Sequence, residues 1–346
     1  MIKKECFTAE WIEQVSSELH YNDKNLIEKV IRALSLLEML VKAGCPLVFK
    51  GGTALMLILG KSAHRLSIDI DVICPPGTNI EDYLKSFADF GFINLELVER
   101  KQRDDADIPK SHSKFFYQIA YRNDTDAQSY ILLDVLYEDI HYFRTQQIAI
   151  DCPFIRLEGK PLMVTVPSAE DILGDKLTAF APNTTGIPYY KNGRSCSMEI
   201  AKQLYDVGRL FENVSDLQIT KEAFRKIAVV ELSYRSFGTD IGQVFNDIRQ
   251  TALCISTRGK AGEGDFDLIQ DGIIRVKSFM YKQRYLIDHA IIDAARAAYL
   301  ATLIEKGINE IESYSNNPAD IKDMVIRPSL PNKLNKLRSN LPEAYY

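Results

Sequence analysis

Two groups of carboxylates in this sequence could do chemistry together. Asp69 and Asp71 stand two residues apart in the run LSIDIDVI (66–73), whose β-branched residues predict a strand. Side chains two apart on a strand face the same way, so both carboxylates should project to one side. Adjacent anions repel unless a cation lies between them, and their oxygens suit Mg²⁺. Asp134, in the apolar run 131–135, offers a third carboxylate for the metal or for a proton from an attacking hydroxyl.

A glycine turn supplies the complementary half of such a site. Gly51, Gly52 and Thr53 follow a short apolar run and open a predicted helix. Residues without a Cβ let backbone N–H groups approach a phosphate, and the start of a helix adds a favourable dipole. A turn and carboxylates together describe a metal-assisted phosphate site, for which a nucleoside triphosphate (NTP) is the natural bridging ligand.

Each of these features alone also fits a purely structural role. The glycine pair lacks the GK[ST] sequence of a P-loop, an Asp-x-Asp is often a solvated strand face, and a lone Asp134 favours a structural role. The order of the features is what favours a site. A strand, the Gly-Gly-Thr turn, a helix, a basic link, a strand with Asp-x-Asp and a later strand with an Asp follow one another.

This order resembles that of a known family. The strings KGGTAL (50–55) and RLSIDID (65–71) are similar to the KGGTAL and RxSxDxD motifs of the AbiEii/AbiGii toxin family of nucleotidyltransferases, in the polymerase-β-like superfamily. KLTA (176–179) is similar to the K-h-x-A motif of the family, and KQLYD (202–206) to its R-D-x-x-D motif. Lys202 and Gln203 depart from the Arg and first Asp of that last motif. Residues 215–346 carry no matching motif.

The resemblance implies roles for particular residues. It implies that Asp69 and Asp71 hold Mg²⁺, that Lys176 neutralises the charge of the triphosphate, and that Asp206 orients Lys176 or contacts the base. Together with the reading of the strands, it gives a catalytic set of Asp69, Asp71, Asp134 and Lys176, in which the three aspartates are the metal ligands. The nucleotide-binding set comprises Lys50, Gly51, Gly52, Thr53, Arg65, Ser67, Lys176 and Asp206.

The family's activity implies that an acceptor hydroxyl attacks the α-phosphate of an NTP and releases pyrophosphate. The resemblance further implies the toxin of a toxin–antitoxin or phage-defence system, with a cognate antitoxin as partner and an RNA, such as a tRNA 3′ end, as acceptor. Two alternatives stay open at this point. The enzyme could modify a small molecule such as an aminoglycoside or a protein hydroxyl, or the chain could be an idle module that binds nucleotide.

The pattern of elements predicts an α+β fold, with a domain of mixed sheet at 1–166 and a mainly helical domain at 167–346, and the resemblance implies that the first is a palm-like nucleotidyltransferase domain. Helical spacing covers residues 8–43, begins again at Thr53 and at 82–92, and continues from Ser168 almost to Asn317. Strands are expected at 47–49, 66–73, 94–100, 115–122, 130–137 and 162–166.

Composition excludes several classes of protein. The 346 residues are 46% hydrophobic and 26% charged, with a net charge of −5, so no global basic field marks a histone-like nucleic-acid binder. The sequence contains no run of about 18 apolar residues, the length that a membrane-spanning helix needs. Acidic residues also interrupt the N-terminal stretch where a signal peptide would be apolar. A cytoplasmic protein is expected. The six cysteines form no CxxC pair and are expected to be reduced thiols.

Overall fold

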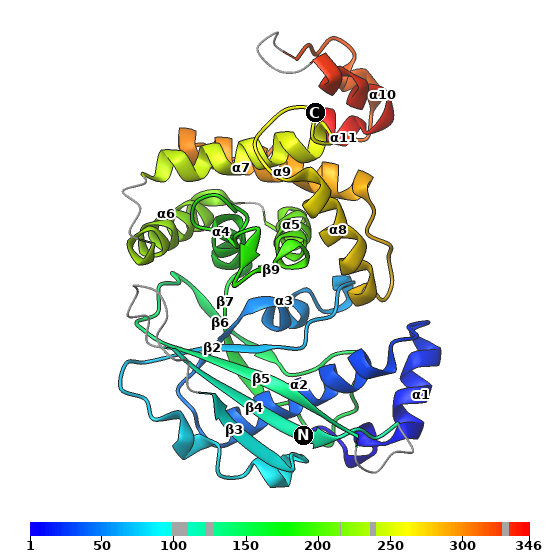
Figure 1. The fold of residues 1–346 in the computed structure, drawn as a ribbon, viewed down its shortest axis with the longest axis vertical. Coiled ribbons are helices and arrows are strands. Elements are labelled where there is room, and N and C mark those ends of the chain that lie inside the picture. The colour runs from blue at the N-terminus through cyan, green and yellow to red at the C-terminus, as the bar shows by residue number, and fades with distance from the viewer. Residues whose placement is uncertain (99–109, 122–126, 215, 236–239, 327–331) are drawn as a thin grey trace. The chain divides into compact units, whose positions relative to one another are not determined.

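The computed structural model describes residues 1–98, 110–121, 127–214, 216–235, 240–326 and 332–346 (Figure 1). The chain divides into two compact units. The first comprises Met1–Ser168 together with Ser278–Arg284, and the second comprises Ala169–Lys277 together with Tyr285–Tyr346. We describe each unit by itself. Whether 1–166 and 167–346 are separate domains stays a prediction.

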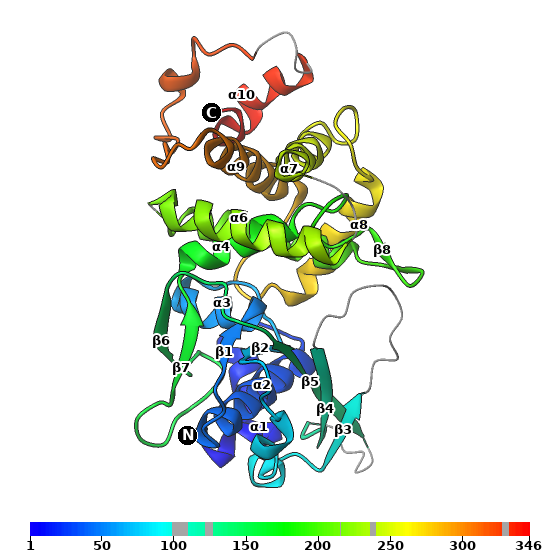
Figure 2. The ribbon, with the colours of Figure 1, turned by 90° about the vertical axis from the view of Figure 1, so that its left-hand side faces the viewer.

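A five-stranded mixed sheet organises the first unit. Its strand order is β1-β2-β5-β4-β3, and β2 and β5 run parallel whereas the other neighbouring pairs are antiparallel. A separate antiparallel pair, β6 and β7, lies beside it (Figure 2). The helices and strands of this unit are α1 (Ala9–Glu18), α2 (Lys24–Lys42), β1 (Val48–Lys50), α3 (Gly51–Leu59), β2 (Ile70–Cys74), β3 (Asn94–Val98), β4 (Lys110–Gln118), β5 (Gln128–Tyr137), β6 (Thr145–Ala149) and β7 (Met163–Pro167).

Helix α2 fills the core of this unit. The side chain of Asp23 accepts from the backbone N–H of Leu26 and caps the first turn, and residues 26–28 and 30–40 are all buried. Alternate residues of β2 and β5, such as Val72 and Leu133, join the same apolar core. Because side chains alternate across a strand, the residues between them project from the other face of the sheet. Asp71 and Asp134 are therefore on the face away from the α2 core.

A short segment from the C-terminal half of the sequence belongs to the first unit. The backbone N–H of Leu66 donates to the carbonyl of Phe279 at 2.8 Å, and the N–H of Tyr281 donates to the carbonyl of His64 at 3.1 Å. The Tyr281 hydroxyl also donates to the carbonyl of Ala63. Segment 278–284 therefore fixes the backbone immediately before the Asp-x-Asp sequence.

The second unit is a helical bundle with one small hairpin. Helices α4 and α5 pack together, and α4 also packs on α6, while α5 contacts α8 and α9. The elements are α4 (Ala169–Ala179), β8 (Tyr190–Lys191), β9 (Arg194–Ser195), α5 (Ser197–Phe211), α6 (Leu217–Tyr234), α7 (Ile241–Ser256), α8 (Phe266–Val276), α9 (Ile287–Lys306), α10 (Leu337–Asn340) and α11 (Pro342–Tyr345). The sheet and these helices confirm the predicted α+β class with a mainly helical second part.

Several local predictions were wrong. The predicted helix over 82–92 is two short 3₁₀ helices, Ile80–Tyr83 and Phe87–Phe90. The buried Leu84 and Phe90 are six residues apart, which places them on different faces of an α-helix, so two short turns bury both. The helical pattern ends at Lys306 rather than near Asn317, because Gly307 adopts a left-handed conformation with φ of 75° and stops α9.

The strands also differ from the prediction in places. Strand β2 begins at Ile70 rather than Leu66, because the backbone before it pairs with segment 278–284, and Asp69 lies one residue outside the strand. Strand β4 starts at Lys110, within a polar stretch that conceals it, and β6 was not predicted. Residues 99–100 of a predicted strand lie outside the described residues.

Two predictions from composition can be compared with the structure. None of the described helices is both long and apolar enough to cross a membrane. All six cysteines are free, and four of them, Cys6, Cys45, Cys74 and Cys254, are buried.

Candidate active site

The glycine turn and the second aspartate are in close contact. Gly51 opens α3 with φ of +80°, a left-handed conformation that favours glycine. A Cβ built on Gly51 would lie 2.2 Å from Oδ2 of Asp71, so no side chain fits between the turn and this carboxylate. Lys50 on β1 pairs in register with Asp71 on β2. The start of α3 and the Asp71 carboxylate therefore share one small space.

Substituting Gly51 with Ala is expected to damage the site beyond the cost of backbone strain. Strain at positive φ costs about 1 kcal/mol, and the contact with Asp71 adds to it. Gly44 is the matched control, because its φ is +74° and a Cβ there meets nothing within 4 Å. Gly44→Ala should lower only the free energy of unfolding, whereas Gly51→Ala should also lower nucleotide binding, measured by calorimetry. Equal binding by both variants would contradict this account.

A set of buried contacts braces the two aspartates. Thr53 is fully buried, and its hydroxyl donates to the carbonyl of Asp69 at 2.7 Å. Arg65 is buried, and its Nη1 donates to the carbonyl of Leu66 at 3.0 Å. A Cβ on Gly52 would lie 2.7 Å from Oγ of Ser67. Thr53 and Arg65 thus hold the backbone that leads to Asp71, and Ser67 packs closely against Gly52.

The second and third aspartates are neighbours across the sheet. Asp71 on β2 and Asp134 on β5 pair in register, so their side chains leave the same face. Nδ1 of His112 on β4 forms a hydrogen bond with Oδ1 of Asp134, whose side chain is 39% exposed. Asp69 is exposed, and in the described part of the chain no group of three or more His, Cys, Asp or Glu residues is placed to hold a metal ion.

These carboxylates nevertheless suit a metal ion whose remaining ligands come from the substrate and water. Mg²⁺ in nucleotide enzymes is usually held by one or two carboxylates plus waters and phosphate oxygens, rather than by a cage of protein groups. Asp71 and Asp134 supply such a pair beside the first backbone N–H groups of α3, which have no partner within the helix. The structure thus brings together Asp71, Asp134 and the glycine turn.

The remaining predicted residues form a compact group in the second unit. Nζ of Lys176 on α4 lies 3.1 Å from Oδ2 of Asp206 on α5, and it donates to Oε1 of Gln203 at 3.0 Å. The side chains of Lys176 and Asp206 are only 9% and 2% exposed. Gln203, which stands where the family motif has an acid, therefore contacts Lys176 through an amide oxygen.

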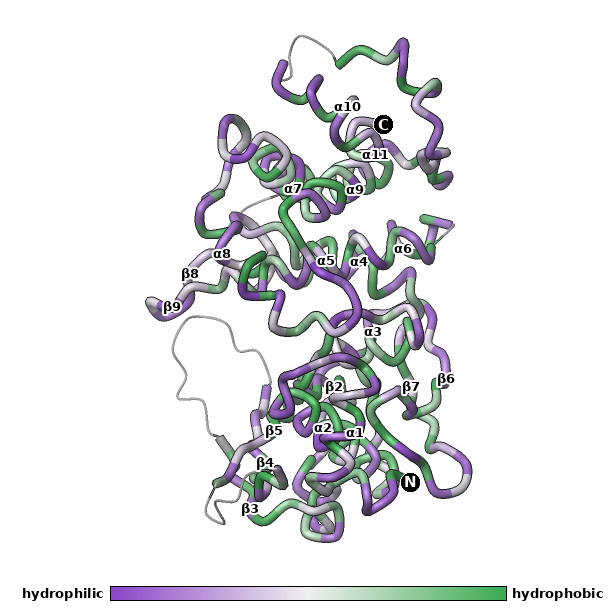
Figure 3. Tube along the Cα trace, turned by 90° about the vertical axis from the view of Figure 1, so that its right-hand side faces the viewer, coloured by the Kyte–Doolittle hydropathy of each residue, from purple (hydrophilic) through white to green (hydrophobic). Residues whose placement is uncertain are grey.

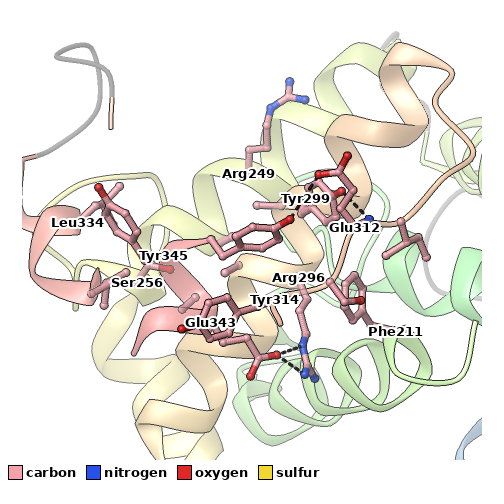
Figure 4. A pocket seen from close by; sticks show the side chains of 18 of the residues that line it. Phe211, Arg249, Ser256, Arg296, Tyr299, Glu312, Tyr314, Leu334, Glu343 and Tyr345 are labelled. Carbon is pink, nitrogen blue, oxygen red and sulfur yellow. Dashed lines mark hydrogen bonds and ion pairs between the residues drawn. The ribbon is translucent and has the colours of Figure 1, made fainter. Parts of the chain in front are cut away.

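A large cavity lies elsewhere in the second unit, between α7, α9 and the C-terminal segment (Figure 4). Its volume is about 980 Å³, and aromatic side chains including Phe211, Tyr299 and Tyr345 line it. Its arginines are paired with acids: Arg296 with Glu343, and Arg249 with Glu305. None of the predicted site residues lines this cavity.

Comparison with known proteins decides the family. The model of the family described as "Nucleotidyl transferase AbiEii toxin, Type IV TA system" matches residues 34–316, which is most of the chain and includes every predicted site residue. The chain belongs to the AbiEii family. It is therefore a nucleotidyltransferase of a toxin family from type IV toxin–antitoxin systems, and the resemblance seen in the motifs is confirmed.

More distant comparisons add little to this AbiEii assignment. JHP933 from Helicobacter pylori is 16% identical, with a TM-score of 0.39, and the match covers 89% of this chain and 95% of that one. The nucleotidyltransferase toxin MenT4 from Mycobacterium tuberculosis is 13% identical, with a TM-score of 0.43 and coverage of 85% and 89%. No curated protein sequence matches the chain.

Two features of this AbiEii chain were missed by the reasoning from sequence. His112 was not among the predicted site residues, although it contacts Asp134 directly. Segment 278–284, which pairs with the backbone before Asp69, was assigned to the helical part. Residues 110–114 are all polar, so no apolar alternation indicates a strand at His112, and no local signal marks segment 278–284.

Proposed function

We propose that this protein transfers a nucleoside monophosphate from an NTP to a hydroxyl of an RNA, with Mg²⁺ as cofactor, and that it acts in this way as a toxin restrained by a cognate antitoxin. The observation that carries the proposal is the contact between the glycine turn at Gly51 and Asp71, with Asp134 next to Asp71 in register. One helix start and two carboxylates there suit a triphosphate and its metal.

The first turn of α3 would bind the triphosphate. Backbone N–H groups of Gly51, Gly52 and Thr53 belong to the helix start, where intrahelical partners are absent and the dipole favours an anion. The Thr53 hydroxyl already donates to the Asp69 carbonyl, so its backbone N–H is the group left for a phosphate. Lys50 directly precedes this turn, and Arg65 lies four residues before Asp69, so each segment has a cation at its N-terminal side.

The aspartates would bind the metal and activate the attacking hydroxyl. Asp69, Asp71 and Asp134 are the residues proposed to hold Mg²⁺, which when bound neutralises phosphate oxygens and aligns the attacking and leaving oxygens. The acceptor oxygen forms a bond to the α-phosphorus while the bond to pyrophosphate breaks. Asp134 is proposed to accept the proton of the acceptor hydroxyl, since its carboxylate is partly exposed.

Lys176 is proposed to stabilise the charge that develops on the triphosphate. Its ammonium group is held by Asp206 and Gln203, so its position is fixed before substrate binds. A neutral amide at Gln203 offsets less of its charge than the carboxylate of the family motif would. The cluster of Lys176, Gln203 and Asp206 therefore presents less negative charge to a phosphate than it would with a second acid in place of Gln203.

The hairpin β8–β9 supports an RNA acceptor. Its tip turns at Asn192 and Gly193, with φ of 51° and 72°, and exposes Tyr190, Lys191 and Arg194. The tip is hydrophilic (Figure 3). An exposed aromatic ring next to a pair of cations is suited to stacking on a base and to contacting the backbone of a single strand.

Incubation with each α-³²P-labelled NTP, Mg²⁺ and total RNA tests the proposal. Label in RNA, with tRNA as the band to examine first, is expected with the wild type and not with Asp71→Ala. A Lys191→Glu/Arg194→Glu variant should label RNA less, while binding NTP as the wild type does. Label on protein would instead support a protein-modifying enzyme, and NTP binding without label would support a small-molecule acceptor or an idle module.

A further inference from the structure

Four charged or titratable side chains form one row across the sheet. Lys50 pairs in register with Asp71, Asp71 with Asp134, and Asp134 with His112, on β1, β2, β5 and β4 in turn. Residues directly opposite on neighbouring strands project from the same face. The row therefore has two carboxylates at its centre, with a lysine at one end and a histidine at the other.

His112 contacts the third carboxylate from one side only. A carboxylate accepts hydrogen bonds, so Nδ1 of His112 donates to Oδ1 of Asp134. The imidazole is 12% exposed, and its Nε2 is buried without a partner among the described residues. Its hydrogen bond to Asp134 is thus the polar contact that the described structure gives this ring.

This contact restricts the rotation of the Asp134 carboxylate. His112 lies on β4, on one side of β5, and Asp71 lies on β2, on the other side. Because Oδ1 of Asp134 is hydrogen-bonded on the β4 side, its Oδ2 lies on the side of Asp71. A partner that orients a ligating carboxylate in this way changes metal affinity or activity by about 10–100-fold when it is removed.

We propose that His112 is a positioning residue of the transferase, which holds Asp134 ready for the metal and the acceptor hydroxyl. The inference rests on the proposed function, because that proposal is what assigns metal binding and proton acceptance to Asp134. Because His112 acts through Asp134, its loss should weaken metal binding and lower kcat, with little change in the KM for the NTP. A structural histidine would instead change stability alone.

Three variants test this role. His112→Leu removes the donor, His112→Asn places an amide donor near the position of Nδ1, and the exposed His20→Asn is the matched control. Mn²⁺ binding is measured from the electron paramagnetic resonance signal of free Mn²⁺, with a non-hydrolysable NTP analogue present. His112→Leu should bind Mn²⁺ about 10–100-fold more weakly, and His112→Asn should restore most of the affinity. The kcat and KM for the NTP are then measured in the transfer assay.

The outcomes separate this inference from the proposed function. Unchanged Mn²⁺ affinity and kcat in His112→Leu, with only a lower Tm, would overturn the role of His112 while leaving the proposed function intact. Equal losses in His112→Leu and His112→Asn would also overturn it, because the amide should rescue a positioning contact. Wild-type protein that neither binds Mn²⁺ nor transfers nucleotide would overturn both proposals.

Discussion

Replacing Asp71 with Asn is expected to lower the rate of nucleotidyl transfer by about 10³-fold or more, which corresponds to roughly 4 kcal/mol of transition-state stabilisation. Asp71 is the carboxylate that meets the glycine turn and pairs with Asp134, so its charge acts on both the metal and the phosphates. The amide keeps the shape of the side chain and removes the charge. Single-turnover kinetics with α-labelled NTP measure the effect.

The matched control is Asp89→Asn, which removes an exposed carboxylate of the same unit. This variant should transfer nucleotide at the rate of the wild type. Circular dichroism melts would show that both variants are folded. If Asp71→Asn kept more than about a tenth of the activity, the carboxylate would not have the role assigned to it here.

The second large effect is expected on stability. Substituting Asp206 with Ala should lower the free energy of unfolding by about 3–5 kcal/mol, because it leaves the buried Lys176 ammonium group without its carboxylate. The amide of Gln203 offsets only part of this loss. Urea denaturation, followed by the circular dichroism of the helices, measures the change.

A double variant separates the charge from the packing. In Lys176→Met/Asp206→Leu both buried partners become apolar, and most of the lost stability should return, since replacing a buried ion pair by apolar groups is often neutral. The double variant should still transfer no nucleotide, because Lys176 is gone. Loss of less than about 1 kcal/mol in Asp206→Ala would show that the pair is better solvated than its burial indicates.

Local patterns were enough to predict the centre of the candidate site. The alternation of β-branched and polar residues around Asp71 and the apolar run around Asp134 marked two strands, and the Gly-Gly pair marked the turn that meets one of them. Both signals are local, because a strand face and a positive φ are dictated by neighbouring residues. The prediction that Asp69 and Asp71 share a strand was wrong for Asp69, which precedes β2.

The missing parts depend on contacts between distant residues. Leu66 lies outside β2 because its N–H donates to the carbonyl of Phe279, more than 200 residues away. No periodicity in the sequence predicts that pairing. His112 reaches Asp134 only because β4 pairs with β5 in one register. Register between strands follows from the whole sheet, so the partner of a given carboxylate could not be read from its own segment.

The most direct test of the central claim follows both ends of the NTP in one reaction. Parallel incubations with α-³²P- and γ-³²P-labelled NTP, acceptor RNA and Mg²⁺ are sampled together, using wild type and Asp71→Asn. Our account predicts one α-label on RNA for each labelled pyrophosphate released by the wild type, and neither product with Asp71→Asn. Transfer of the γ-label, or release of orthophosphate without α-label on RNA, would contradict nucleotidyl transfer at this site.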